Sequence, residues 1–193
     1  MRRDSGVRVF VALDIPEEVR AALGALVAQL KGVCRGARWT RVEGLHVTLK
    51  FVGEASEDQV KRMQAALAGI RATGPAQMTF AGAGFFPNAR SPRVFWAGIE
   101  GSPVLAWLAT EVERRLEPLG VERETRPFRP HLTLARFNSP GDAAGLPEAL
   151  QKLGPLHFGS LQASVFHLYE SHLERGGARY ERLATFPFVV SGG

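Results

Sequence analysis

Two short segments of the sequence each place a histidine two residues before a threonine. They are His46-Val47-Thr48-Leu49 and His131-Leu132-Thr133-Leu134, and no other His-x-Thr occurs in the chain. In a β-strand, residues i and i+2 point to the same face. Each segment would therefore present an imidazole beside a hydroxyl, while its apolar residues anchor the opposite face in the core.

This combination of side chains suits hydrolysis of a phosphodiester. One imidazole can take a proton from water and the other can give a proton to the leaving oxygen, because neutral and protonated histidine coexist near neutral pH. The hydroxyls of Thr48 and Thr133 can donate to phosphate oxygens as negative charge builds up. Neither histidine has Asp, Glu or Cys nearby at ligand spacing. We therefore expect no metal site and no cofactor.

The elements that must position these side chains alternate between helices and strands, which favours an α+β fold with antiparallel sheets. Asp14 is expected to cap the first helix, with Pro16 in its first turn. Strands are expected near residues 7–13, 39–52, 78–80, 94–99, 126–137, 161–169 and 180–188, and helices near 14–31, 56–70, 102–119 and 143–153.

The recurrence of the histidine segment suggests an internal duplication. Two similar lobes that face each other across a cleft would bring both histidines to one site. No linker-like stretch separates the halves. We therefore expect residues 1–193 to form a single domain made of two intertwined lobes.

The composition permits an anionic partner. The chain of 193 residues has 24 Lys and Arg against 19 Asp and Glu, a net charge of +5. Several arginines surround the second histidine segment, namely Arg123, Arg126, Arg129 and Arg136. They could guide an RNA backbone, although a solvated basic edge is an equally good interpretation for each of them except Arg136.

The cysteine content and the hydropathy of the chain bear on the compartment in which the protein is expected. The single cysteine, Cys34, excludes a disulfide framework within the chain, and no apolar run reaches the length of a membrane span. We expect a monomeric cytoplasmic protein that does not associate with membranes. His157, His167 and His172 lack a partner pattern, and the sequence assigns them no role.

The sequence resembles the two-histidine (2H) phosphoesterases, in particular the bacterial and archaeal RNA 2′,3′-cyclic phosphodiesterases, also called 2′-5′ RNA ligases. The resemblance covers nearly the whole chain. It rests on four segments, which are Arg8–Pro16, Leu45–Glu54, Arg129–Arg136 and Gly177–Tyr180.

This resemblance implies two pseudo-twofold-related lobes, each an antiparallel sheet with helices packed outside, and hydrolysis of RNA 2′,3′-cyclic phosphate ends, including those of tRNA fragments, to 2′-phosphomonoesters. It implies that His46 is the proton donor and His131 the proton acceptor. It also implies that Phe51 and Arg136 flank the terminal base, a position that suits an aromatic ring and a guanidinium plane. Ligation would be the reverse direction of related chemistry.

Two other functions remain open at this point. The same cleft could act on a small cyclic nucleotide instead of RNA. Alternatively, the chain could be a non-catalytic module that binds RNA ends. The presence of both histidines and both threonines argues against a pure binding module, since binding alone does not require two titratable groups.

Overall fold

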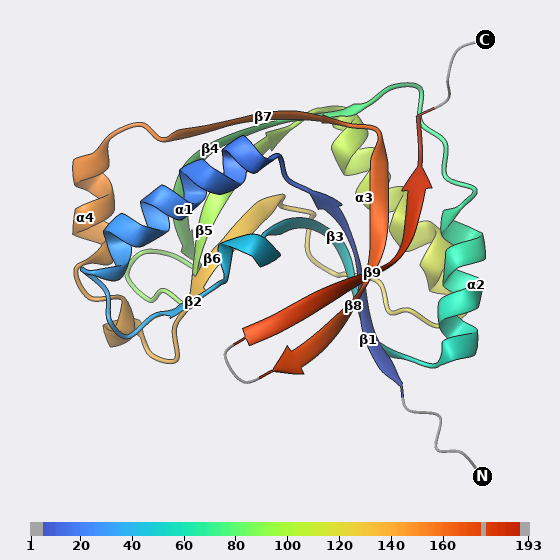
Figure 1. Cartoon of the computed structure of the whole chain (residues 1–193), viewed down its shortest axis with the longest axis horizontal. Coiled ribbons are helices and arrows are strands. Elements are labelled where there is room, and N and C mark those ends of the chain that lie inside the picture. Colours follow the sequence, from blue (N-terminus) through green and yellow to red (C-terminus); the bar gives the residue numbers. More distant parts are fainter. Residues whose placement is uncertain (1–5, 175–176, 190–193) are drawn as a thin grey trace.

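The computed structural model describes residues 6–174 and 177–189, which form two antiparallel sheets with helices around them (Figure 1). Sheet A has the strand order β3-β1-β8-β9, and sheet B has the order β2-β6-β5-β4-β7. The strands are β1 (Val7–Asp14), β2 (Arg38–Trp39), β3 (His46–Ala55), β4 (Ala76–Phe86), β5 (Val94–Gly101), β6 (His131–Arg136), β7 (His157–Ala163), β8 (Val165–Glu174) and β9 (Gly177–Pro187). The helices are α1 (Glu17–Lys31), α2 (Glu57–Leu67), α3 (Pro103–Leu116) and α4 (Leu146–Leu153), with short 3-10 helices η1 (Val42–Gly44), η2 (Glu117–Leu119) and η3 (Pro140–Ala143). This architecture confirms the expected α+β fold.

Apart from β2, which borders β6 in sheet B, the two sheets share one topology. In sheet A, β1 leads through α1 to β3, which pairs antiparallel with β1. In sheet B, β5 leads through α3 to β6, which pairs antiparallel with β5. The next strand is β8 in sheet A and β4 in sheet B, so each sheet takes this strand from the other half of the chain. The halves are interleaved, and β3 and β6, which begin with the two histidines, hold equivalent positions.

The helices tie the sheets together. α1 packs against β7 of sheet B although it follows β1 of sheet A, and α3 contacts β3 and β4, one strand of each sheet. α2 packs against α3 at the opposite end of the molecule from α4 (Figure 1).

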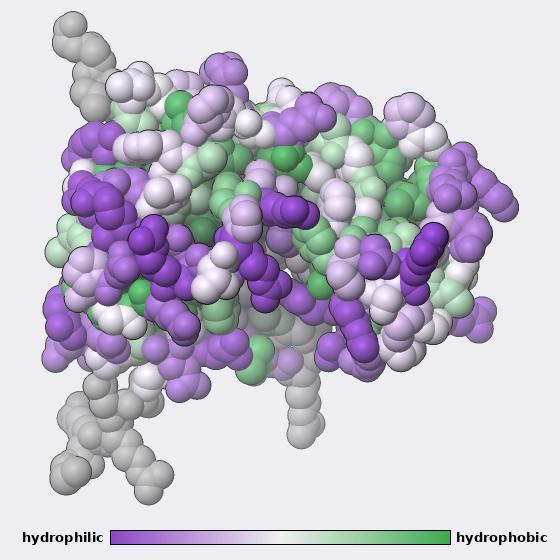
Figure 2. Space-filling view, turned by 180° about the vertical axis from the view of Figure 1, so that it is seen from behind, coloured by the Kyte–Doolittle hydropathy of each residue, from purple (hydrophilic) through white to green (hydrophobic). Residues whose placement is uncertain are grey.

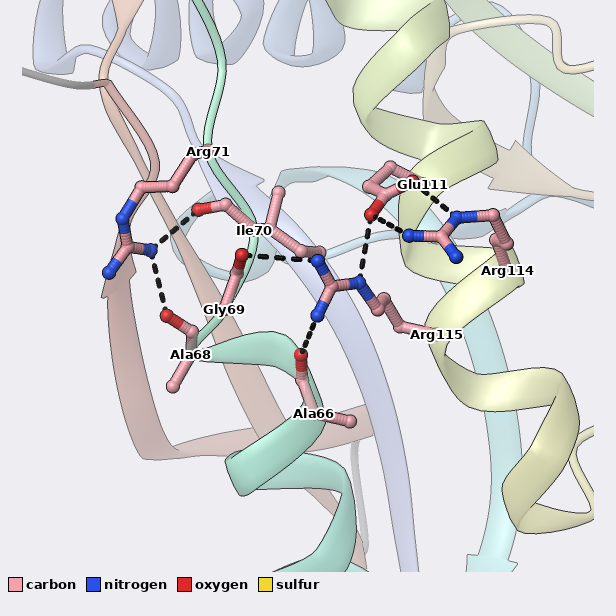
Figure 3. A network of polar contacts seen from close by, with 8 residues as sticks. All are labelled: Ala66, Ala68, Gly69, Ile70, Arg71, Glu111, Arg114 and Arg115. Atoms are coloured by element: carbon pink, nitrogen blue, oxygen red, sulfur yellow. Dashed lines mark hydrogen bonds and ion pairs between the residues drawn. The ribbon is translucent and has the colours of Figure 1, made fainter.

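Arg115 of α3 holds the end of α2 in place (Figure 3). Its guanidinium donates to the carbonyl oxygens of Ala66 and Gly69. It also binds the carboxylate of Glu111, which Arg114 contacts as well. These hydrogen bonds lower the pKa of Glu111 to about 2, so the network stays ionised at neutral pH.

The two faces of sheet A have different surroundings. Val9, Val11 and Leu13 of β1 belong to a large hydrophobic core that runs through both sheets. The alternate residues Phe10 and Ala12 point to the other face, where they form a second, small apolar cluster with Tyr169 and Tyr180. His46 of β3 lies on this second face, against Phe10 and Tyr180.

The surface is mixed in character. On the face shown in Figure 2, hydrophilic residues are interspersed with hydrophobic ones, as is usual for a surface in contact with water. Within residues 6–174 and 177–189, no helix is long and apolar enough to cross a membrane.

The expected strand 126–137 begins only at His131, and two further sequence-based expectations were wrong in detail. Asp14 does not cap α1: the cap position is Pro16, without a side-chain hydrogen bond, because the Asp14 carboxylate binds Tyr169 and Arg182 on sheet A. The expected strand 161–169 is in fact two strands, because the chain leaves β7 of sheet B at Ala163 and enters β8 of sheet A at Val165.

Candidate active site

The two histidines are held by the same local contact. Nδ1 of His46 lies 2.8 Å from the carbonyl oxygen of Gly44, and Nδ1 of His131 lies 2.7 Å from that of Arg129. A carbonyl oxygen only accepts hydrogen bonds, so each Nδ1 carries a proton. In both rings Nε2 is therefore the atom that can exchange a proton with a substrate.

The segment that precedes each histidine is bonded to the strand that carries the other one. Thr40, upstream of His46, donates its backbone N–H to the Leu134 carbonyl of β6 at 2.8 Å. Lys50 of β3 donates to the Glu122 carbonyl, upstream of His131, at 2.7 Å. β3 and β6 also contact each other directly. These reciprocal bonds fix the two histidine strands relative to one another.

η1, which leads into His46, is further held by α1. The Arg20 guanidinium donates to the carbonyl oxygens of Val42 and Glu43 at 2.8 and 2.9 Å. These residues immediately precede Gly44, whose carbonyl orients the His46 ring. Arg20 therefore holds the segment that carries the Gly44 carbonyl, and no pattern in the sequence indicated this contact.

A β-bulge in each histidine strand changes which residues face the site. The pairing of β1 with β3 skips Leu49, since adjacent residues of β1 face Thr48 and Lys50. The pairing of β5 with β6 skips Leu134 in the same way. Each bulge shifts the alternation by one residue, so the fifth residue after the histidine joins the histidine's face. These residues are Phe51 and Arg136, and both are exposed.

Aromatic side chains enclose His46. The Phe10 ring stacks on the imidazole with centroids 4.5 Å apart, and the Tyr180 ring meets it edge-on at 5.0 Å. Asp14 lies directly opposite His46 on β1. Burial lowers the pKa of His46 below its ordinary value, although the Gly44 carbonyl and the Asp14 carboxylate act in the opposite direction.

His131 has fewer aromatic neighbours. The edge of Phe86 approaches its ring with centroids 5.1 Å apart, and Phe86 in turn packs on Trp96. Trp96 lies opposite Thr133 on the neighbouring strand. Thr133 is half-buried and Thr48 is exposed. Among the described residues, neither threonine hydroxyl is engaged in a hydrogen bond, so both are available to a ligand.

Phe51 is more than half exposed, at 55%. The Arg8 guanidinium lies over its ring, 5.5 Å from the centroid. Arg8 thus adds a positive charge beside the aromatic ring that the family resemblance indicated. The other arginines near His131, namely Arg123, Arg126 and Arg129, are exposed.

The histidines without a partner pattern lie in different surroundings. His167 is buried, with Nδ1 2.9 Å from the Thr185 hydroxyl and Nε2 3.5 Å from Asp14. His172 lies 3.5 Å from the carboxylates of both Glu170 and Glu181, and His157 is exposed. No cluster of three or more His, Cys, Asp or Glu side chains that could hold a metal is found in the described ranges.

Comparisons with known proteins agree with this duplicated arrangement. The chain matches the family model of LigT-like phosphoesterases over residues 13–96 and 100–180, and each stretch contains one histidine segment. A protein named RNA 2′,3′-cyclic phosphodiesterase from Archaeoglobus fulgidus is 32% identical over 93% of this chain and 99% of its own length. A protein of the same name from Thermus thermophilus is 33% identical over 93% of this chain and 89% of its own length.

Solved structures show the same similarity. A Thermus thermophilus protein superposes with a TM-score of 0.79 and 32% identity, covering 94% of this chain and 97% of its own. E. coli LigT in complex with 3′-AMP has a TM-score of 0.76 and 30% identity, covering 95% and 98% of the two chains. With both histidine strands inside the matched regions, this chain belongs to the LigT-like phosphoesterase family.

Proposed function

We propose that this protein hydrolyses the 2′,3′-cyclic phosphate at the end of an RNA chain to a 2′-phosphomonoester. The observation that carries the proposal is the matched pair of histidines, each held through Nδ1 by the carbonyl two residues before it. Relatives over almost the whole chain are named RNA 2′,3′-cyclic phosphodiesterase.

The proposed reaction is a displacement at phosphorus. His131 takes a proton from water through Nε2 as the water oxygen bonds to phosphorus. The bond between phosphorus and O3′ breaks on the opposite side, and His46 gives its proton to O3′. Thr48 and Thr133 donate to the phosphate oxygens as charge builds up. The step leaves His131 protonated and His46 neutral, and exchange of protons with solvent restores the starting state.

The surroundings of His46 make its role as the acid depend on the bound substrate. His46 is enclosed by Phe10 and Tyr180, and burial disfavours its charged form in the free protein. A bound phosphate brings negative charge beside the ring and favours the protonated form. His46 would thus become a competent acid when the substrate arrives.

The terminal nucleotide is proposed to lie between Phe51 and Arg136. Aromatic rings and guanidinium planes both stack on bases, and the two bulges place both side chains on the histidine faces. A base held there would orient the ribose and decide which oxygen faces His46. With an RNA 5′-hydroxyl in place of water, the same step would form a 2′-5′ linkage.

One assay tests the proposal. The purified protein is incubated with an RNA that ends in a 2′,3′-cyclic phosphate, with and without a chelator, and the product phosphate is identified. We expect a 2′-phosphate, formed at the same rate with and without the chelator. We further propose that the protein acts as a monomer in the cytoplasm, on RNA ends such as those of tRNA fragments. A 3′-phosphate would contradict the role of O3′. Turnover of cyclic nucleotides alone, or binding without turnover, would favour the alternative functions.

A further inference from the structure

Tyr180 of β9 lies against the histidine that we propose as the acid. Its ring meets the His46 imidazole edge-on, with centroids 5.0 Å apart, and meets Phe10 in the same manner at 5.1 Å. A Cβ atom placed on Gly44 would lie only 3.1 Å from the Tyr180 ring. The ring is thus packed between His46 and the residue whose carbonyl orients it.

The Tyr180 hydroxyl lies in the field of a charge from the other sheet. Burial raises the pKa of Tyr180, while the positive charge of Arg136 acts to lower it. The phenol therefore keeps its proton at neutral pH and can donate a hydrogen bond. Within residues 6–174 and 177–189, the hydroxyl of the other tyrosine, Tyr169, binds Asp14, whereas no such bond is found for Tyr180.

Tyr180 therefore lies against His46 and is influenced by the charge of Arg136, and we assign both of these groups to the substrate site. His46 belongs to β3 of sheet A and Arg136 to β6 of sheet B, whereas Tyr180 comes from β9, the outer strand of sheet A. A phosphate that receives the His46 proton on one of its ester oxygens must present its other oxygens to neighbouring donors. A neutral phenol is suited to this task, because it donates without competing for the proton.

We propose that Tyr180 is a third hydroxyl donor to the reacting phosphate, in addition to Thr48 and Thr133. The inference rests on the proposed function, and it assigns to the β8–β9 hairpin a direct part in binding the substrate. The ring of Tyr180 has a second effect, since it shields one side of His46 from water.

The Tyr180→Phe variant tests the hydroxyl, because it keeps the ring and the packing on His46. A hydrogen bond to a charged group typically changes an equilibrium by about 10-fold to 100-fold. We expect kcat/KM for the RNA cyclic phosphate to fall by this amount, and the affinity for inorganic phosphate, measured by calorimetry, to fall as well. The pH at which activity declines should stay the same, since the imidazole surroundings are unchanged.

Two further variants separate contact from packing. Arg179→Gln is the matched control, because Arg179 is the adjacent residue of β9 and pairs with Glu174 in the hairpin; it should leave phosphate affinity unchanged. Tyr180→Leu removes the ring as well, so it should also move the pH profile by exposing His46 to water.

The proposal is overturned if Tyr180→Phe matches the wild type in both kcat/KM and phosphate affinity. It is also overturned if Arg179→Gln lowers phosphate affinity as much as Tyr180→Phe does, because the effect would then belong to the hairpin as a whole. If the wild type does not turn over cyclic phosphates, the proposed function fails, but the phosphate affinities still decide whether the hydroxyl touches phosphate.

Discussion

The imidazole of His46 is enclosed on more sides than that of His131. Phe10 covers one face of His46 and Tyr180 meets the ring edge-on, whereas only Phe86 approaches the His131 ring among the described aromatic side chains. The backbone contact at Nδ1 is the same in both. The surroundings, and not the local strand geometry, therefore distinguish the two histidines chemically, as an acid and base pair requires.

Replacing either histidine should remove most of the activity and leave the fold intact. We expect His46→Ala and His131→Ala each to lower turnover by about 10² to 10⁴, the usual contribution of a general acid or base. Turnover of cyclic-phosphate RNA and the urea midpoint of each variant check this. His157→Ala, at an exposed position, is the control and should behave as the wild type. A folded His46 or His131 variant with full activity would contradict the mechanism.

The pH dependence follows from the burial of His46. As the proposed acid, His46 must be protonated, and burial lowers its pKa. The decline of kcat/KM with rising pH should therefore come below the ordinary histidine value of about 6.5. Bound phosphate favours the protonated ring, so kcat should decline at a higher pH than kcat/KM.

Both profiles can be measured at constant ionic strength, with Asp14→Asn as the informative variant. The Asp14 carboxylate favours protonated His46, so its removal should move the decline of kcat/KM further toward low pH. His46 is not the acid if the decline of kcat/KM moves to higher pH in Asp14→Asn. The same follows if, in the wild type, kcat declines at a lower pH than kcat/KM does.

At the scale of residues, the sequence predicted the site side chains that belong to a repeated pattern. It did not predict the side chains that contact His46 from other strands. The two histidines and two threonines stand at equal spacing on strands, so their shared face follows from strand geometry. Phe10 and Tyr180 reach His46 only because β1 and β9 are folded against it. Aromatic residues at strand positions are ordinary, and nothing in their spacing marks them as neighbours of His46.

At the scale of elements, the bulges explain a discrepancy between pattern and site. Strict alternation along β3 would place Lys50 with His46 and would turn Phe51 toward the core. The skipped residue Leu49 reverses this, so Lys50 is buried and Phe51 is exposed. The resemblance to the family predicted Phe51 as a site residue, whereas the alternation alone could not. No residue type in this segment signals a bulge.

Lys50 also joins β3 to α3 and to the segment before His131. Its ammonium lies 2.6 Å from the Glu113 carboxylate, which accepts from the backbone of Glu124 as well. Lys50 is 7% exposed. We expect Glu113→Ala to lower the free energy of unfolding by about 3 to 5 kcal/mol, because it leaves a buried ammonium without its partner.

Urea unfolding measures this effect, and an exposed ion pair provides the control. Lys61 and Asp58 lie 3.8 Å apart on α2 with both side chains largely exposed, so Asp58→Ala should change the unfolding free energy by less than about 1 kcal/mol. The double variant Lys50→Met, Glu113→Leu should recover much of the loss, since no charge is then buried. Equal losses in Glu113→Ala and Asp58→Ala would show that the Lys50 ion pair contributes no special stability.

At the scale of the whole molecule, the sequence predicted the fold class but not how its halves interleave. The order of strands and helices and the repeated segment indicated antiparallel sheets and two lobes. The place of β8 beside β1 depends on contacts between distant parts of the chain, which no local pattern records, whereas β4 pairs with the next strand, β5. For the same reason, the sequence predicted one strand over residues 161–169, whereas the chain passes from sheet B to sheet A at Ser164.

The positive charge on the segment that leads to His131 leads to a prediction about RNA length. Arg123, Arg126 and Arg129 are exposed on the segment that leads to His131, where they can contact phosphates beyond the reacting one. Each contacted phosphate of a single strand steepens the fall of log affinity with log salt by about 0.7. Affinity for a non-hydrolysable oligonucleotide should therefore fall more steeply with salt than affinity for a mononucleotide.

Replacing the three arginines by Gln should reduce the slope for the oligonucleotide alone, while Arg62→Gln, on the surface of α2, should leave both slopes unchanged. Equal slopes for the two ligands in the wild type would mean that only the terminal nucleotide is held, and would favour a small cyclic nucleotide as the substrate.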